Sequence, residues 1–87
     1  MVYDEIKELS SIIFNSGNDT IRIYSDEDEV NINHSGKHIY IKKGGRIDIN
    51  IEYVGFGFNI DDLVKLNRLC QSLILENIVE SLTMEEG

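Results

Sequence analysis

Four adjacent carboxylates, in the stretch Ser-Asp-Glu-Asp-Glu-Val at residues 25–30, are the most chemically distinctive feature of this 87-residue chain. Asp26 and Asp28 have the spacing that opens a calcium-binding loop, whose oxygen ligands occupy fixed positions along the segment. The later positions do not fit, because Val30 stands at the fifth, no glycine stands at the sixth, and Lys37 stands at the twelfth. We therefore predict no metal site at these acids.

No other grouping of residues predicts catalysis or cofactor binding. His34 and His38 flank a predicted hairpin turn on opposite sides of a sheet, and no acid or cysteine completes a ligand set with them. Cys70 lies within an apolar helical stripe, which is typical of a buried structural thiol. Residues 55–60 begin like a dinucleotide-binding fingerprint but end in isoleucine, and the two acids that follow would repel phosphate. We predict no catalytic residue, no cofactor and no enzymatic activity.

The net charge of −8 is distributed unevenly along the chain. Residues 1–36 hold eight acids and two bases, and residues 47–87 hold the same numbers. Between them, residues 37–46 hold four bases and no acid. A net charge of this size repels nucleic acid and anionic membrane and attracts basic surfaces. We therefore expect a basic protein partner, with no direct binding of nucleic acid and no membrane partner.

The hydrophobic pattern predicts a helix, four strands and a second helix. A helical stripe over residues 2–15 predicts the first helix, and Gly17 suits a left-handed cap behind it. The period then changes from 3.6 to 2 in four isoleucine-rich segments separated by short turns. The predicted strands are Thr20–Tyr24, Glu29–His34, Lys37–Lys42 and Arg46–Tyr53. This alternation is typical of an antiparallel meander with one dry face and one wet face.

The last helix is predicted to run from about Ile60 to Leu82, with Asn59 as its N-terminal cap. Its apolar residues cover more of the circumference than the stripe of about 100° that one sheet requires. Leu69 and Val79 fall on its charged side. We expect part of the helix to pack on the first helix and part to remain for a partner. The fold class is α+β in two layers, as a single α-β-β-β-β-α domain over residues 1–87.

Three features predict a cytoplasmic protein. A single cysteine excludes an internal disulfide and favours a reducing compartment. The N-terminal residues are acidic where a signal peptide is basic. No apolar run approaches the roughly 18 residues of a membrane span.

Acids held on a rigid frame can imitate the phosphates of nucleic acid and so occupy a groove lined by arginine and lysine. The predicted partner-binding residues are Asp26, Glu27, Asp28, Glu29, Asp48, Glu52, Asp61 and Asp62. The alternative is that residues 26–29 form a solvated turn whose charge serves only solubility.

In size, charge and element order the chain resembles the small phage-encoded inhibitors of host defence nucleases, which include anti-CRISPR proteins that mimic DNA. The likeness covers the whole chain through features such as the acids at 26–29, 61–62 and 85–86, without a shared motif. It implies an inhibitor that occupies a basic groove of a nucleic-acid enzyme, such as a CRISPR effector, in a bacterial host cell. The basic segment 37–46 departs from the uniformly acidic surface of a pure mimic.

Two further functions remain open. The first is a structural module that self-associates as a homodimer through the broad apolar face of the last helix. In either protein-binding case, Leu69 and Val79 are the candidates for a hydrophobic interface. The second is a sheet that binds RNA by stacking bases on Tyr24 and Tyr40 of its wet face.

Overall fold

The computed structural model describes residues 1–51 and 59–86 of the chain. The elements are α1 (Val2–Phe14), the 3₁₀ turn η1 (Asn18–Thr20), β1 (Arg22–Ser25), β2 (Glu29–His34), β3 (Lys37–Lys42), β4 (Ile47–Ile51) and α2 (Ile60–Glu86). The predicted α+β order of helix, four antiparallel strands and helix is confirmed. The end of the predicted fourth strand, including Glu52, lies outside the described residues.

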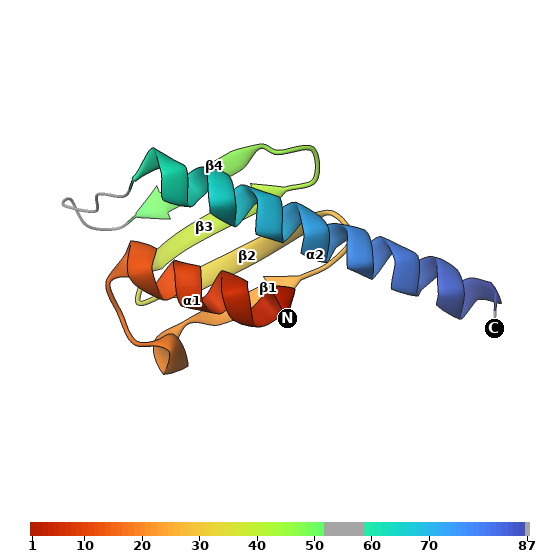
Figure 1. The fold of residues 1–87 in the computed structure, drawn as a ribbon, viewed down its shortest axis with the longest axis horizontal. Helices are drawn as coiled ribbons and strands as arrows, with labels where there is room; N and C mark the ends of the chain where they lie inside the picture. Colours follow the sequence, from red (N-terminus) through yellow and green to blue (C-terminus); the bar gives the residue numbers. More distant parts are fainter. Residues whose placement is uncertain (52–58, 87) are drawn as a thin grey trace.

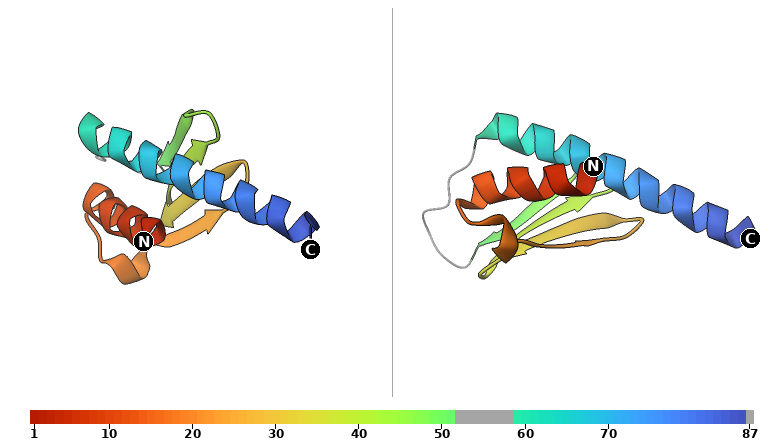
Figure 2. Two further views of the ribbon diagram at one scale, coloured as in Figure 1. Left: turned by 45° about the vertical axis from the view of Figure 1, so that its right-hand side comes forward. Right: turned by 60° about the horizontal axis from the view of Figure 1, so that its bottom comes forward.

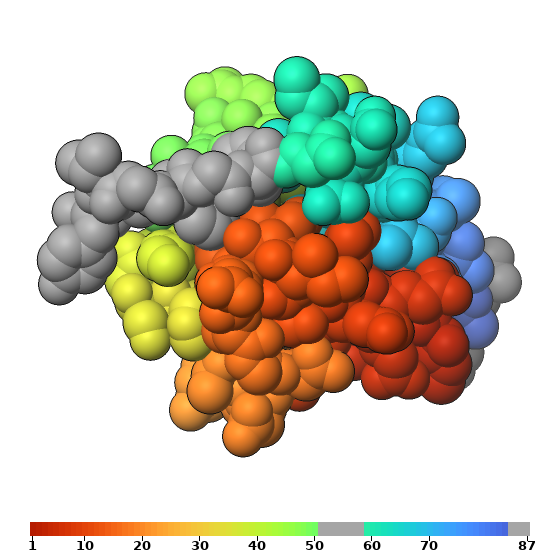
Figure 3. Space-filling view, turned by 60° about the vertical axis from the view of Figure 1, so that its left-hand side comes forward, coloured from red at the N-terminus to blue at the C-terminus, as the bar shows by residue number. Residues whose placement is uncertain are grey.

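The molecule has two layers (Figures 1 and 2). The strands form a meander in the order β1-β2-β3-β4. Both helices lie side by side and antiparallel on one face of this sheet, and they leave the other face uncovered. Seen from the end where α2 begins, α1 lies between the start of α2 and the η1–β1 segment (Figure 3).

The strand register places the isoleucines together on the face under the helices. Ile23, Ile32, Ile39 and Ile49 form one row across the sheet. Ile32 and Ile39, at the centre of that row, are fully buried, whereas Ile49 on the edge strand β4 is 37% exposed. The core is therefore deepest under the two central strands, where each fully buried isoleucine stabilises the fold by roughly 1.5–3 kcal/mol.

The turns use residues that tolerate a positive φ. Ser35 and Gly36, with φ of 44° and 77°, form the two-residue loop between β2 and β3. Two consecutive positive φ angles give a loop whose twist matches that of the flanking strands. At the end of α1 the left-handed cap is Asn15, with φ of 53°, and not the predicted Gly17. Asparagine tolerates this conformation, so the helix ends two residues earlier than the glycine suggests.

The helix α2 is longer than the sheet that it covers. Its 27 residues span about 40 Å, whereas a six-residue strand spans about 20 Å. The C-terminal part of α2 therefore extends beyond the sheet, as Figure 1 shows. The longest dimension of the molecule, 47 Å against 25 and 22 Å for the other two, reflects this projection.

Amide side chains hold α2 in register on the sheet. Asn67 Nδ2 donates to Gly45 O at 3.1 Å, and Gln71 Nε2 donates to Lys42 O at 2.7 Å. One to two turns further along, Asn77 Nδ2 donates to Asp26 O at 3.1 Å. These bonds satisfy carbonyl groups of the β3–β4 and β1–β2 turns, which lie at the same end of the sheet.

The single cysteine provides a test of the core. Cys70 is fully buried, and desolvation by that burial raises the pKa of its thiol from 9.0 to about 12. Because the thiolate is the reactive form, we expect the folded protein at pH 8 to react with an aromatic disulfide reagent roughly a thousandfold more slowly than the urea-unfolded protein. The folded-state rate should still rise with pH above 9, where the rate of the unfolded protein levels off. Similar rates in the two states would contradict this burial.

Candidate functional site

The acidic segment Asp26–Glu29 is the turn between β1 and β2. Asp26 Oδ1 accepts hydrogen bonds from the backbone N–H groups of Asp28 at 2.7 Å and of Glu29 at 2.9 Å. The backbone N–H of Asp26 donates to Glu29 O at 3.0 Å and closes the turn. The carboxylate of Asp26 therefore holds the turn together, in the manner common to aspartates at turn positions.

The same turn is also tied to its neighbours. The Lys43 N–H donates to Asp28 O at 2.7 Å, which joins the turn to the β3–β4 connection. The carboxylate of Glu29 forms an ion pair with Lys42 across the β2–β3 pair. That hydrogen bond to Glu29 raises the pKa of Lys42. Two of the four acids thus interact within the chain.

The basic segment predicted from the sequence lies directly beside these acids. Lys42 pairs with Glu29, and Arg46 Nε lies 3.2 Å from Asp48 Oδ1. A uniformly acidic track does not exist at this end of the sheet. Among the described residues, the side chains of Glu27 and Asp28 remain exposed and without a hydrogen bond or ion pair.

The other predicted acids lie elsewhere. Asp61 and Asp62 stand in the first turn of α2, and the predicted cap is confirmed, because Asn59 Oδ1 accepts from the Asp61 N–H at 2.9 Å. The helical rise places Asp61 about 24 Å along the axis from Asn77, which contacts the acidic turn. The structure therefore does not bring the predicted acids together, and Glu52 lies outside the described residues.

The two predicted hydrophobic interface residues have different environments. Leu69 is partly buried and packs against the core, so the structure corrects its assignment to the charged side of the helix. The reason is that α1 and the sheet together cover a wider arc of α2 than the sheet alone would. Val79 is 54% exposed, although its neighbour Ile78 packs against the core, so Val79 lies on the face of α2 that these elements do not cover.

Val79 belongs to an apolar strip that begins on the outward face of α2 over the end of the sheet and continues onto the projecting part of the helix. Leu75 and Leu82 are 61% and 57% exposed. Spacing of four and three residues puts the side chains of Leu75, Val79 and Leu82 on one face of the helix, and we name this strip the α2 ridge. The sequence contained one signal for it: an apolar helix about twice as long as the strands beneath.

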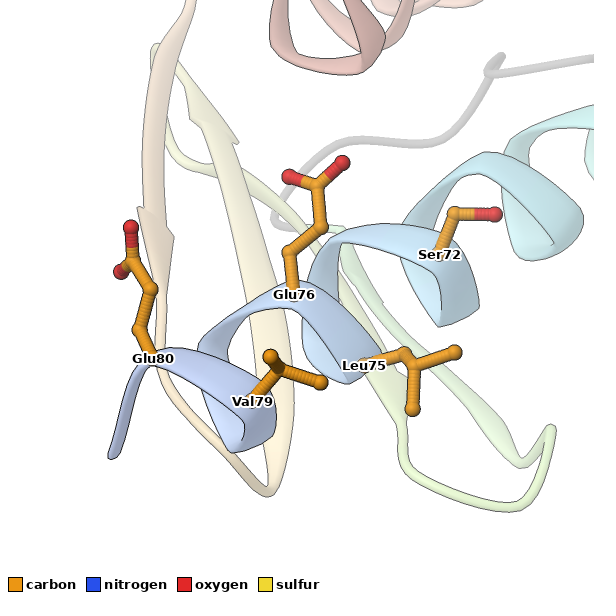
Figure 4. A pocket seen from close by; sticks show the side chains of 5 residues that line it. All are labelled: Ser72, Leu75, Glu76, Val79 and Glu80. Atoms are coloured by element: carbon orange, nitrogen blue, oxygen red, sulfur yellow. The ribbon is translucent and has the colours of Figure 1, made fainter. Parts of the chain in front are cut away.

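Glutamates border the α2 ridge (Figure 4). A shallow hollow along α2 is lined by Ser72, Leu75, Glu76, Val79 and Glu80. In this view Leu75 and Val79 lie on one side of the helix, and Glu76 and Glu80 project from the adjacent side. The surface is therefore apolar along its centre and anionic along one margin.

The uncovered sheet face has its own pattern of contacts. The rings of His38 and Tyr40 are stacked at 6.0 Å between centroids, and Lys42 Nζ lies 5.8 Å from the Tyr40 centroid. Tyr24 is 58% exposed on the outer strand. Lys42, the cation that lies over the Tyr40 ring, is already paired with Glu29, which lowers its capacity to hold phosphate.

Within the part of the chain that the structure describes, no group of three or more histidine, cysteine, aspartate or glutamate residues could hold a metal ion. In the same residues, no helix has the length and apolar character needed to cross a membrane. Comparisons with protein-family models, with curated proteins and with solved structures found no match.

The structural role of Asp26 can be tested by unfolding. We expect Asp26→Ala to lower the free energy of unfolding by about 1–2 kcal/mol, because two turn N–H groups lose their acceptor. Asp26→Asn keeps an oxygen in place and should retain most of that stability. The neighbouring Glu27→Ala should change stability by less than about 0.5 kcal/mol. Equal effects of Asp26→Ala and Glu27→Ala in urea titrations would show that the turn does not depend on Asp26.

Proposed function

We propose that this protein is a non-enzymatic binding module that presents the α2 ridge to another protein. The observation that supports this most directly is the exposure of Leu75, Val79 and Leu82, each more than half exposed, on a helix that extends past its own sheet. Isolated exposed apolar residues are ordinary, but a contiguous row at helical spacing is typical of an interaction site.

The spacing of the ridge fits recognition of a helix by a groove. In that mode an amphipathic helix inserts side chains at positions i, i+4 and i+7 into an apolar groove of the partner. Here the helix is already formed and its first half is anchored by Asn67 and Gln71. Binding would therefore require little ordering of the backbone, which favours affinity.

The charge around the ridge defines the partner further. Residues 69–86 contain four acids and no base. Glu76 and Glu80 lie beside the ridge, and the last turn of α2 holds no base to offset the negative end of the helix dipole. We propose a partner whose apolar groove is flanked by lysine or arginine.

The same charges disfavour self-association through this surface. If two copies paired their ridges in antiparallel fashion about a two-fold axis, the margins that hold Glu76 and Glu80 would face each other. Like charges at such positions destabilise helix pairing, and no base within residues 69–86 would compensate them.

A second, narrower candidate is the inhibitor of a nucleic-acid enzyme, such as a CRISPR effector, that the sequence resemblance implies. One observation favours it: Glu27 and Asp28 are exposed and unpaired among the described residues. The bond from Asn77 to the acidic turn places them within about one helical turn of Glu76 and Glu80 along α2. A basic groove could be approached by both sets of acids at this end of the molecule.

The ridge is tested by capture followed by measurement on purified proteins. Wild-type protein and Leu75→Gln/Val79→Gln would be used as baits in nuclease-treated bacterial lysate that also contains a panel of CRISPR effectors. For a partner retained by the wild type, we expect the double variant to bind roughly 30-fold more weakly. The reason is that each side chain loses about 1 kcal/mol of apolar burial at the interface. Isothermal titration with the purified partner gives the value.

Controls separate the candidate functions. Lys65→Gln/Arg68→Gln changes two exposed residues of α2 outside the ridge and should leave affinity unchanged or raise it. Glu76→Gln/Glu80→Gln should weaken binding and reduce its dependence on salt. Unchanged binding by the ridge variant would refute the proposal. A concentration-dependent dimer in light scattering, lost in Leu75→Gln/Val79→Gln, would establish self-association instead.

A further inference from the structure

The outer edge of β1 has no strand beside it. The sheet order places β1 at one end, and β1 pairs with β2 along Arg22–Ser25. In an antiparallel edge strand, alternate residues point their N–H and C=O groups away from the sheet. The outward groups of β1 are therefore available to another extended chain, within the part of the molecule that the structure describes.

A shallow cleft runs along this same edge. It is lined by Tyr3 and Lys7 from α1, by Asp19 from η1, and by residues 21–24 of β1 and its approach. Because three consecutive strand residues and the residue before them line it, the cleft follows the strand edge and is not confined to one face of the sheet. Figure 3 shows α1 lying directly against the η1–β1 segment.

Two of the residues that line the cleft are cations with no ion pair among the described residues. Neither Lys7 nor Arg22 forms an ion pair with any described residue, and Asp19 is the one acid among the residues that line the cleft. By contrast, Lys42 and Arg46 at the other end of the sheet are both paired. In a chain of net charge −8, two of the eight bases thus remain available at one place for an anionic ligand.

The remaining lining suits an extended peptide. Tyr3 and Tyr24 are 42% and 58% exposed, and Ile23 is partly buried beside the core. Along β1 the side chains alternate, with Ile23 toward the helices and Arg22 and Tyr24 toward the uncovered sheet face. An added strand would therefore meet apolar contacts on one face and a cation with an aromatic ring on the other.

We infer that this cleft binds an extended acidic peptide segment of another protein, which adds a fifth strand to the sheet at β1. Backbone hydrogen bonds from β1 would hold the strand, and acidic side chains of the peptide would meet Lys7 and Arg22. A second copy of this chain does not fit the same site, because antiparallel pairing of β1 with itself would gather two copies of both cations. The inference is independent of the α2 ridge, none of whose residues lines the cleft.

A displayed library of randomised eight-residue peptides tests this inference. Peptides selected on the wild type, after depletion on Lys7→Gln/Arg22→Gln, would be synthesised and titrated into ¹⁵N-labelled protein. We expect them to contain acids together with β-branched residues and to shift the amide signals of Arg22–Ser25. Affinity should fall roughly tenfold in Lys7→Gln/Arg22→Gln and remain unchanged in the matched control Lys65→Gln/Arg68→Gln. N-methylation of alternate peptide residues should abolish binding, since it removes backbone donors without changing charge.

Four results would overturn the inference. The first is that no selected peptide prefers the wild type, and the second is that the amide shifts lie only on another surface. The third is that peptides N-methylated at either set of alternate residues bind as tightly as the unmodified peptide. The fourth is that acetate or inorganic phosphate alone causes the same amide shifts. The last would identify a site for small anions. The ¹⁵N spectrum of each unliganded variant shows whether it is folded, so that loss of binding is not confused with loss of structure.

Discussion

The position of α2 along the sheet depends on three amide side chains that reach the turns at one end of the sheet. Asn67 and Gln71 bind the β3–β4 turn, and Asn77 binds the β1–β2 turn. Each bond is accepted by a backbone carbonyl, and that of Lys42 also accepts from the Gly45 N–H at 3.0 Å. A shift of the helix by one turn would break all three bonds, whereas Leu66, Cys70 and Ile74, which are spaced by four residues, would stay on the helix face that meets the sheet. The polar contacts therefore select one register among those that the apolar spacing allows, and this register decides which part of α2 projects.

In that register, α2 crosses the end of the sheet that holds most of the charge interactions within the chain. At the end where the β1–β2 and β3–β4 turns meet, acids and bases lie next to each other, and most of them are engaged within the chain. Asp26 accepts hydrogen bonds from the backbone N–H groups of Asp28 and Glu29, so the acidic segment stabilises the β1–β2 turn. At this end of the molecule, the described acids that form no ion pair include Glu27, Asp28, Glu76 and Glu80. These four acids lie near an exposed apolar strip.

Much of the fold could be predicted because its signals are local. The alternation of apolar residues along β2 and β3, the Ser35-Gly36 loop and the Asn59 cap each arise from a few neighbouring residues, and the structure has all of them. The errors came where two local signals competed. Asn15 ended α1 before Gly17 could, and η1 occupied the predicted start of β1, where Thr20 donates through both its N–H and its hydroxyl to Gly17 O.

The sequence alone determined the elements, their order and the dry face of the sheet, because periodicity and turn residues act over a few positions. It also showed that the last helix carries more apolar surface than one sheet can cover. Only the tertiary structure decided which part of that surface stays exposed, since burial depends on where distant elements end: Leu69 is covered, whereas Leu75 and Leu82 are not. For the same reason, charge counts along the chain could not reveal the pairing of Glu29 with Lys42, or that Lys7 and Arg22 form no ion pair with another described residue. Charges separated by many residues compensate each other only when folding places them side by side.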